Sequence, residues 1–233
     1  MDIIVQVWRY KNLESCPRKQ QRQKEIEYCV GTHFSNPNIN TVHLLGIKED
    51  ERYFKTLFPK AIYFVVPYQP TYGMMFEYAN NNIEHGKVIC ICNTDIEIGY
   101  FNPMILNRVN NMVLLALTRH NVFDGRSDSY QIENYGGSHD AFITRLPLTR
   151  INYPRLNFKQ NLFGAENVLM FEFTIAGYTL KNPCKQIPIY HHHKDESYFE
   201  QYKRINHDKN TVMCPPSDLG IYDEGHRIHQ DSP

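Results

Sequence analysis

The chain has 233 residues with 25 basic and 25 acidic side chains, so its formal net charge at neutral pH is zero. A neutral balance argues against a protein that binds nucleic acid through a broad basic surface, because such binding needs many Lys and Arg contacts to phosphates. No apolar segment approaches the roughly 18 residues of a membrane-spanning helix, and charges interrupt residues 1–10 too early for a secretory signal.

The first hundred residues alternate between strand and helix patterns. Strands are predicted at 2–8, 40–45 and 61–66, and helices at 18–34, 49–57 and from 72 onward, the last capped by Thr71. This alternation predicts an α/β fold with a mostly parallel central sheet flanked by crossover helices. We interpret the basic first half of the helix at 18–34 as a solvated face.

An apolar run from Lys87 to Cys92 ends abruptly in Asn93-Thr94-Asp95. A strand that is apolar on both faces is typical of the centre of a parallel sheet, and ligands collect beyond the carboxyl ends of such strands. At that end Asp95 can hold a divalent cation, which in turn can hold phosphates. An Asp that only starts a turn or caps a helix is the alternative.

The second half of the chain is less regular. We expect a short helix at 101–111, a strand at 112–119, a long polar loop at 121–137, a short strand from 141 and mostly irregular chain at 147–162. An amphipathic helix is predicted from Val168 to Ala176, closed by Gly177. Glu166 lies at its amino end, where the helix dipole favours a carboxylate whether or not that group has a catalytic function.

An extended segment, 187–193, ends in three histidines. Because side chains two apart in extended chain face the same way, His191 and His193 can point at one ion or phosphate; a solvated histidine cluster is the alternative. A helix at 197–204 follows, and we expect one domain at 1–205 and a polar tail or linker at 206–233. Two of the six cysteines lie inside the buried run, which favours reduced thiols in an intracellular, cytoplasmic protein.

Four separated segments, taken in order, resemble the GT-A-type glycosyltransferases that use nucleotide sugars. They are residues 69–80, 91–96 with Asn93-Thr94-Asp95, 115–119 with Ser138-His139-Asp140-Ala141-Phe142-Ile143, and 163–167 with 176–178, 182–184 and His191-His192-His193. The resemblance covers roughly residues 1–200, and it is greatest to the amino-terminal domain of chlorovirus enzymes that glycosylate the capsid protein. It implies a GT-A-like fold in a viral protein that acts in the cytoplasm of the host cell.

The resemblance also implies a metal-dependent reaction in which a hexosyl or deoxyhexosyl group moves from a nucleoside-diphosphate sugar, such as a UDP-sugar, to a glycan or glycoprotein acceptor with inversion. Mn²⁺ or Mg²⁺ is expected on Asp95 with His191 or His193, although Asn93 replaces the first Asp of the family's Asp-x-Asp motif. The catalytic base is expected to be Glu166 or Asp140. The residues expected to bind the donor are Trp8, Tyr10, Thr71, Asn93, Thr94 and Arg119.

Two other classes of protein remain open. A sugar-phosphate nucleotidyltransferase would use a similar sheet and acidic site, but residues 8–12 contain no glycine where such enzymes carry a Gly-rich loop. A non-catalytic zinc-supported or sugar-binding module could use Cys184, His191 and His193, whose spacing fits no common zinc pattern.

Overall fold

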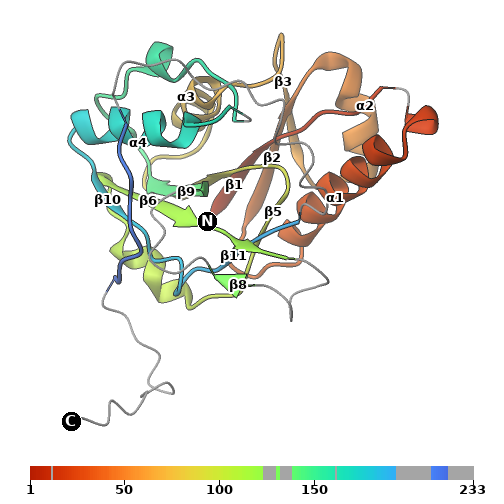
Figure 1. Ribbon diagram of the computed structural model, residues 1–233. Helices are drawn as coiled ribbons and strands as arrows, with labels where there is room; N and C mark the ends of the chain where they lie inside the picture. The colour runs from red at the N-terminus through yellow and green to blue at the C-terminus, as the bar shows by residue number, and fades with distance from the viewer. Residues whose placement is uncertain (12, 123–129, 132–137, 161, 193–210, 220–233) are drawn as a thin grey trace, which may run out of the picture.

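A seven-stranded sheet forms the centre of the computed structural model, which describes residues 1–11, 13–122, 130–131, 138–160, 162–192 and 211–219. The strand order is β10-β6-β9-β4-β1-β2-β3 (Figure 1). Its pairs are parallel except the two that β9 makes, with β4 and with β6. The predicted α/β class with a mostly parallel sheet is therefore confirmed. The strands are β1 Asp2–Gln6, β2 Thr41–Gly46, β3 Ile62–Val65, β4 Val88–Cys92, β6 Val113–Thr118, β9 His139–Arg145 and β10 Thr179–Lys181.

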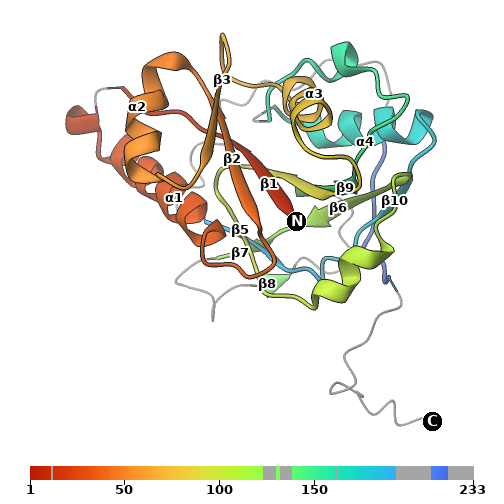
Figure 2. The ribbon, with the colours of Figure 1, turned by 180° about the vertical axis from the view of Figure 1, so that it is seen from behind.

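Helices cover both faces of this sheet (Figures 1 and 2). Alternate side chains of β4 divide between the faces, as strand geometry requires. Ile89 and Ile91 pack on the side of α3 (Tyr72–Asn82) and α4 (Ala165–Ile175). Cys90 and Cys92 pack on the side of α1 (Pro17–His33) and α2 (Lys48–Leu57). All five residues of β4 are buried, so the prediction of a central strand apolar on both faces is confirmed.

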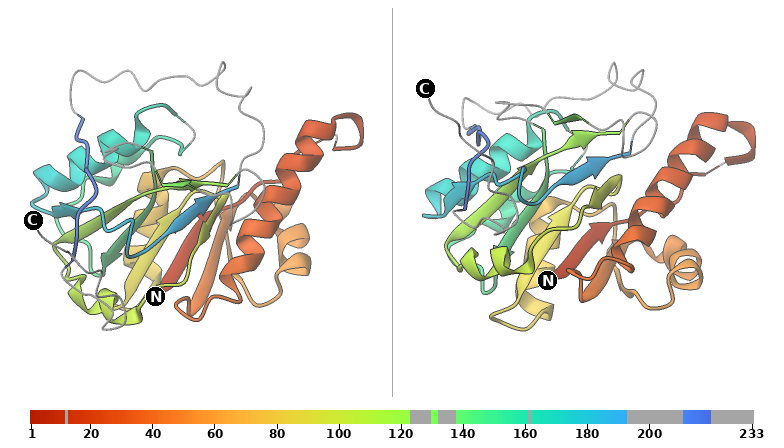
Figure 3. Two further views of the ribbon diagram at one scale, coloured as in Figure 1. Left: turned by 60° about the horizontal axis from the view of Figure 1, so that its bottom comes forward. Right: turned by 90° about the horizontal axis from the view of Figure 1, so that it is seen from below.

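A smaller four-stranded sheet, with order β5-β11-β7-β8, lies over the α1 side of the large sheet (Figure 3). Its strands are β5 Ile96–Ile98, β7 His120–Asn121, β8 Tyr130–Gln131 and β11 Ile189–His191. β11 pairs antiparallel with β5, so that His191 lies opposite Ile96. This pairing brings the histidine segment beside Asp95, which precedes Ile96 in the chain.

The helix limits follow local chemistry. Pro17 opens α1, one residue before the predicted start, because a first helical turn tolerates proline. The Thr71 hydroxyl accepts a hydrogen bond from the Met74 amide at 3.3 Å and caps α3. α4 begins at Ala165, three residues earlier than predicted, and ends before Gly177, whose φ is +94°. Short 3-10 helices occupy Leu13–Ser15, Pro103–Arg108 and Tyr153–Leu156, the second of them within the helix predicted at 101–111.

Residues 211–219, within the predicted tail, run along α4 and β10 (Figure 1). The Asn182 side chain donates to the Cys214 carbonyl at 2.8 Å, and a ring nitrogen of His139 lies 3.0 Å from the same oxygen. The remainder of the predicted tail and the helix predicted at 197–204 lie outside the described residues. Each of the six cysteines is described, and each is a free thiol. Within the described stretches, no helix combines the length and apolar character that crossing a membrane requires.

Candidate active site

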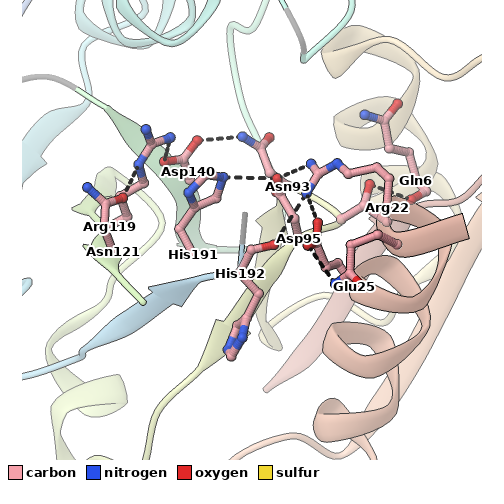
Figure 4. A network of polar contacts seen from close by, with 12 residues as sticks. Gln6, Arg22, Glu25, Asn93, Asp95, Arg119, Asn121, Asp140, His191 and His192 are labelled. Carbon is pink, nitrogen blue, oxygen red and sulfur yellow. Dashed lines mark hydrogen bonds and ion pairs between the residues drawn. The ribbon is translucent and has the colours of Figure 1, made fainter. Parts of the chain in front are cut away.

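Asp95 lies in the turn that follows the carboxyl end of β4 and is 7% exposed. Its Oδ2 lies 2.9 Å from Nε2 of His191 and is in contact with the guanidinium of Arg22, which reaches across from α1 (Figure 4). Arg22 Nη1 also donates to Oε2 of Glu25 at 2.9 Å and to the carbonyl of His192 at 3.3 Å. One carboxylate oxygen thus meets an imidazole and a guanidinium at the edge of the sheet where the fold places ligands.

Charge interactions decide the ionisation of this pair. Burial would raise the pKa of Asp95, but the nearby Arg22, and then His191, outweigh it and hold that pKa well below its ordinary value. Burial likewise opposes the charge on Arg22, yet the attraction of Asp95 raises the pKa of the guanidinium. Both groups are therefore charged at neutral pH.

A second cluster lies beside the first and is centred on Asp140 of β9. Oδ1 of Asp140 accepts from the Asn93 amide at 2.5 Å, and Oδ2 accepts from Arg119 Nη1 at 3.0 Å (Figure 4). Arg119 Nε donates in turn to Asn121 at 3.1 Å. The backbones of Asn93 and Asp140 are joined as well, since the backbone N–H of Asn93 donates to the Asp140 carbonyl at 2.9 Å. Burial opposes the charge on Arg119, but Asp140 outweighs it and raises the pKa of the guanidinium.

Glu166 occupies the first turn of α4 and is partly buried. Burial, followed by the charge of Asp140, raises the pKa of Glu166 to about 8. Among the described residues, no side chain forms a hydrogen bond or ion pair with its carboxyl group. The two candidate bases therefore differ, because both oxygens of Asp140 are bound by neighbouring side chains.

The remaining residues expected to bind the donor lie around this edge. Trp8 and Tyr10 follow β1 and meet edge to face, with ring centroids 6.2 Å apart. The Thr94 hydroxyl donates to the Gln6 carbonyl at 3.0 Å and joins the end of β4 to the end of β1. Thr71 caps α3. Both threonine hydroxyls thus hold backbone in place, and a role for any of these residues in donor binding stays a prediction.

The structure brings Asp95 together with His191, and Asn93 and Arg119 together with Asp140. His193 lies outside the described residues. Within the described parts of the chain, no group of three or more His, Cys, Asp or Glu side chains is placed to hold a metal ion. The set of Cys184 and His191 considered for zinc therefore gains no further ligand there.

Two contacts of the site were not foreseen. The interpretation of the first half of α1 as a solvated face is wrong for Arg22, whose side chain is only 18% exposed. The sequence held a signal, because Arg22, Ile26 and Cys29 follow the i, i+4, i+7 spacing of one helix face, and the latter two are buried. The second contact joins a ring nitrogen of His192 to Oε2 of the buried Glu97 at 2.8 Å.

The donor atoms of Asp95 and His191 suit a divalent cation. Ligand atoms about 2.1 Å from Mg²⁺ at right angles lie about 3 Å from each other, and the two atoms here are 2.9 Å apart. An imidazole with a carboxylate suits Mn²⁺. Such cations are often held by one or two protein ligands, with substrate phosphates and water completing the shell. The pair therefore offers two ligand atoms, and the other ligands of a cation held here would have to come from a substrate or water.

Solved structures identify the architecture as the GT-A fold. TarS from S. aureus, residues 1–349, matches with a TM-score of 0.51 and 9% identity over 82% of this chain and 59% of that chain. Its complex with UDP-GlcNAc gives the same score and identity over 86% and 60%. GalNAc-T7 with UDP, GalNAc and Mn²⁺ also gives 0.51 and 9%, over 84% and 43%.

The chain thus spans 60% or less of the length of these proteins, and at this identity the likeness concerns the fold. No protein-family model and no curated protein matches the sequence. The expected similarity to chlorovirus enzymes stays a prediction.

Proposed function

We propose that the protein is a glycosyltransferase that moves a sugar from a nucleoside-diphosphate sugar to a hydroxyl of a glycan or glycoprotein. The contact between Asp95 and His191 at the ligand-binding edge of a GT-A sheet carries this proposal. The chain supplies that contact from segments 96 residues apart, which the fold brings together at this edge. Two of the similar structures contain UDP or UDP-GlcNAc, which makes a UDP-sugar the first donor to test.

Glu166 is the proposed base. Its raised pKa, about 8, lies close to neutral pH, and a general base works best when its pKa is near the pH at which the reaction takes place. In an inverting transfer it would remove the proton of the acceptor hydroxyl as that oxygen bonds to the anomeric carbon and the bond to the diphosphate breaks. Asp140, held at both oxygens by Asn93 and Arg119, is better suited to position sugar hydroxyls than to take a proton.

A divalent cation is part of the proposal, with Mn²⁺ preferred and Mg²⁺ as the alternative. Arg22 and Arg119 face the carboxylates of Asp95, Glu25 and Asp140, so negative charge is in excess before a diphosphate arrives. A cation on Asp95 and His191 would act as a Lewis acid that stabilises the leaving diphosphate. The arginines would add hydrogen bonds to its oxygens.

The test is release of the nucleoside diphosphate from a panel of UDP-, GDP- and TDP-sugars in the presence of Mn²⁺. Turnover with one donor is expected, together with its loss in Asp95→Ala and its persistence in Lys24→Gln, a change on the exposed side of α1. Pyrophosphate release from a sugar phosphate and a nucleoside triphosphate would instead favour a nucleotidyltransferase. Binding of a nucleotide sugar without release, over long incubation with glycan acceptors, would favour a sugar-binding module.

The predicted likeness to chlorovirus enzymes makes a capsid glycan the first acceptor to test. A glycan of that kind is a proposal for the acceptor only, and the donor assay above does not depend on it, because slow hydrolysis of the donor by water also releases the diphosphate. A cytoplasmic site of action in the host cell belongs to the same proposal.

A further inference from the structure

Arg22 lies where an added cation would have to sit. Its guanidinium contacts the same carboxylate oxygen, Oδ2 of Asp95, that faces Nε2 of His191. We infer that Arg22 and a divalent cation compete for Asp95, so that the free protein binds the metal weakly and the guanidinium moves from Asp95 to the diphosphate when donor and metal enter together. This inference rests on the proposed function and adds a residue that controls the order of binding.

The competition follows from charge and space. A metal ion bound to Oδ2 of Asp95 and to His191 would stand against the Arg22 guanidinium, because all three groups meet at one oxygen. Two cations that share one oxygen repel each other strongly in a buried site, where water screens little. Asp95 can therefore serve either the guanidinium or the metal, but not both in this arrangement.

Arg22 has the means to turn toward a diphosphate. Its Nη1 is used by Glu25 and by the His192 carbonyl, and its Nη2 contacts Asp95. Nε and one hydrogen of Nη2 make no hydrogen bond to another described residue. A guanidinium presents its donors as a flat fork that matches phosphate oxygens. Glu25, one turn further along α1, can hold the guanidinium at the edge of the site after Asp95 is released.

The charge of the site gives the move a direction. Before the donor binds, Arg22 neutralises a buried carboxylate that would otherwise stand near two further acids, Glu25 and Asp140. A divalent cation replaces that charge on Asp95 and brings the diphosphate with it. The displaced guanidinium then meets new phosphate oxygens, so that release of Asp95 leaves no cation without an anionic partner.

Two affinities test the inference, and neither needs turnover. The first is that of Mn²⁺ alone, measured as the loss of the free-ion signal in electron paramagnetic resonance. The second is that of UDP at saturating Mn²⁺, measured by the fluorescence of Trp8, the single tryptophan of the chain. A charge-assisted hydrogen bond contributes enough that its loss changes affinity by about tenfold or more.

Arg22→Gln is expected to bind Mn²⁺ alone about tenfold more tightly than the wild type and UDP about tenfold more weakly. Lys24→Gln, which removes the same charge from the exposed side of the same helix, should stay within about twofold of the wild type in both assays. Arg22→Lys keeps the positive charge but loses the flat set of donors of the guanidinium. Its affinities for Mn²⁺ and for UDP should therefore lie between those of the wild type and those of Arg22→Gln.

Unchanged Mn²⁺ affinity in Arg22→Gln, or an equal gain in Lys24→Gln, would overturn the inference even if UDP binds well. If Arg22→Gln fails to fold, an affinity for Mn²⁺ in Arg22→Lys equal to that of the wild type overturns it. A wild-type protein that binds no UDP, GDP or TDP with Mn²⁺ refutes the proposed function, and the inference fails with it.

Discussion

Replacing Glu166 by Gln removes a carboxyl group whose pKa the fold raises far above its ordinary value. Burial and Asp140 move the pKa of this carboxyl group from 4.5 to about 8. The folded protein therefore holds the proton more tightly than the unfolded chain does, so the contribution to stability is full below pH 4.5 and declines as the pH rises through 8. The linkage relation gives a loss of roughly 4 kcal/mol from pH 5 to pH 9, of which about 1.4 kcal/mol falls above pH 7.

Thermal unfolding of the wild type and Glu166→Gln between pH 7 and pH 9 measures this difference. In a chain of this length 1 kcal/mol corresponds to a change in Tm of about 2–4 °C, so the wild type should lose about 3–6 °C more than the variant. Thiols of the unfolded chain also titrate in this range, but they do so in both proteins and cancel in the comparison. Glu84→Gln, at an exposed carboxyl group, is the matched control and should follow the wild type.

Activity gives an independent reading of the same group. A base with a pKa of about 8 must lose its proton to act, so kcat/KM should rise about tenfold per pH unit below 8 and level off above it. Glu166→Gln should lose about 10²–10⁴ in rate. Parallel stability curves for the wild type and Glu166→Gln, together with a rate that is flat from pH 6 to pH 9, would refute the assignment of a raised pKa and with it the base.

Three other substitutions test the fold that supports the site. His33 is buried beside Cys92, and burial lowers its pKa to about 3. The free energy of unfolding should therefore fall as the pH drops below 6.5, by about 2 kcal/mol at pH 5. In urea titrations, His33→Leu should not show this dependence of the unfolding free energy on pH. Gly73→Ala would place a methyl group 2.5 Å from the Tyr153 carbonyl and should cost roughly 1–3 kcal/mol, whereas Gly31→Ala meets only a ring atom at 3.9 Å and should not lower the urea midpoint. Asn182→Ala loses the hydrogen bond to the Cys214 carbonyl, and limited proteolysis should cut residues 211–219 faster than in the wild type. Equal cutting rates would show that this hydrogen bond does not hold residues 211–219 on the sheet.

Local patterns predicted six of the seven strands of the large sheet, because each of those strands carries its own signal, whereas β10 was not predicted. The run at 88–92 is apolar at every position, and alternating burial on two faces follows from strand geometry alone. The helix predicted at 18–34 likewise matches α1 within one residue at each end. The periodicity of a strand does not say which other strands it pairs with. The antiparallel position of β9 between β4 and β6 could therefore not be predicted, although its residues were predicted to form a short strand.

The site was harder to foresee for the same reason. The approach of His191 to Asp95 depends on the pairing of β11 with β5, a three-residue strand too short for any periodic signal. The contact of Arg22 with Asp95 depends on how α1 lies against the sheet, because the charged end of a long side chain can reach either solvent or a buried group. The sequence therefore predicted Asp95 as a site residue but did not predict its contact with the Arg22 guanidinium.

The passage of the chain from one sheet to the other sets a limit on how the protein can be altered. Cys92 pairs with Ala141 in the large sheet, and Ile96 pairs with His191 in the small one, so Asn93, Thr94 and Asp95 are all that separates β4 from β5. A residue inserted here would have to be absorbed by a strand on either side, turning its core side chains outward. The length of this linker is therefore fixed, and protein engineers who wish to reshape the candidate site should lengthen the chain elsewhere.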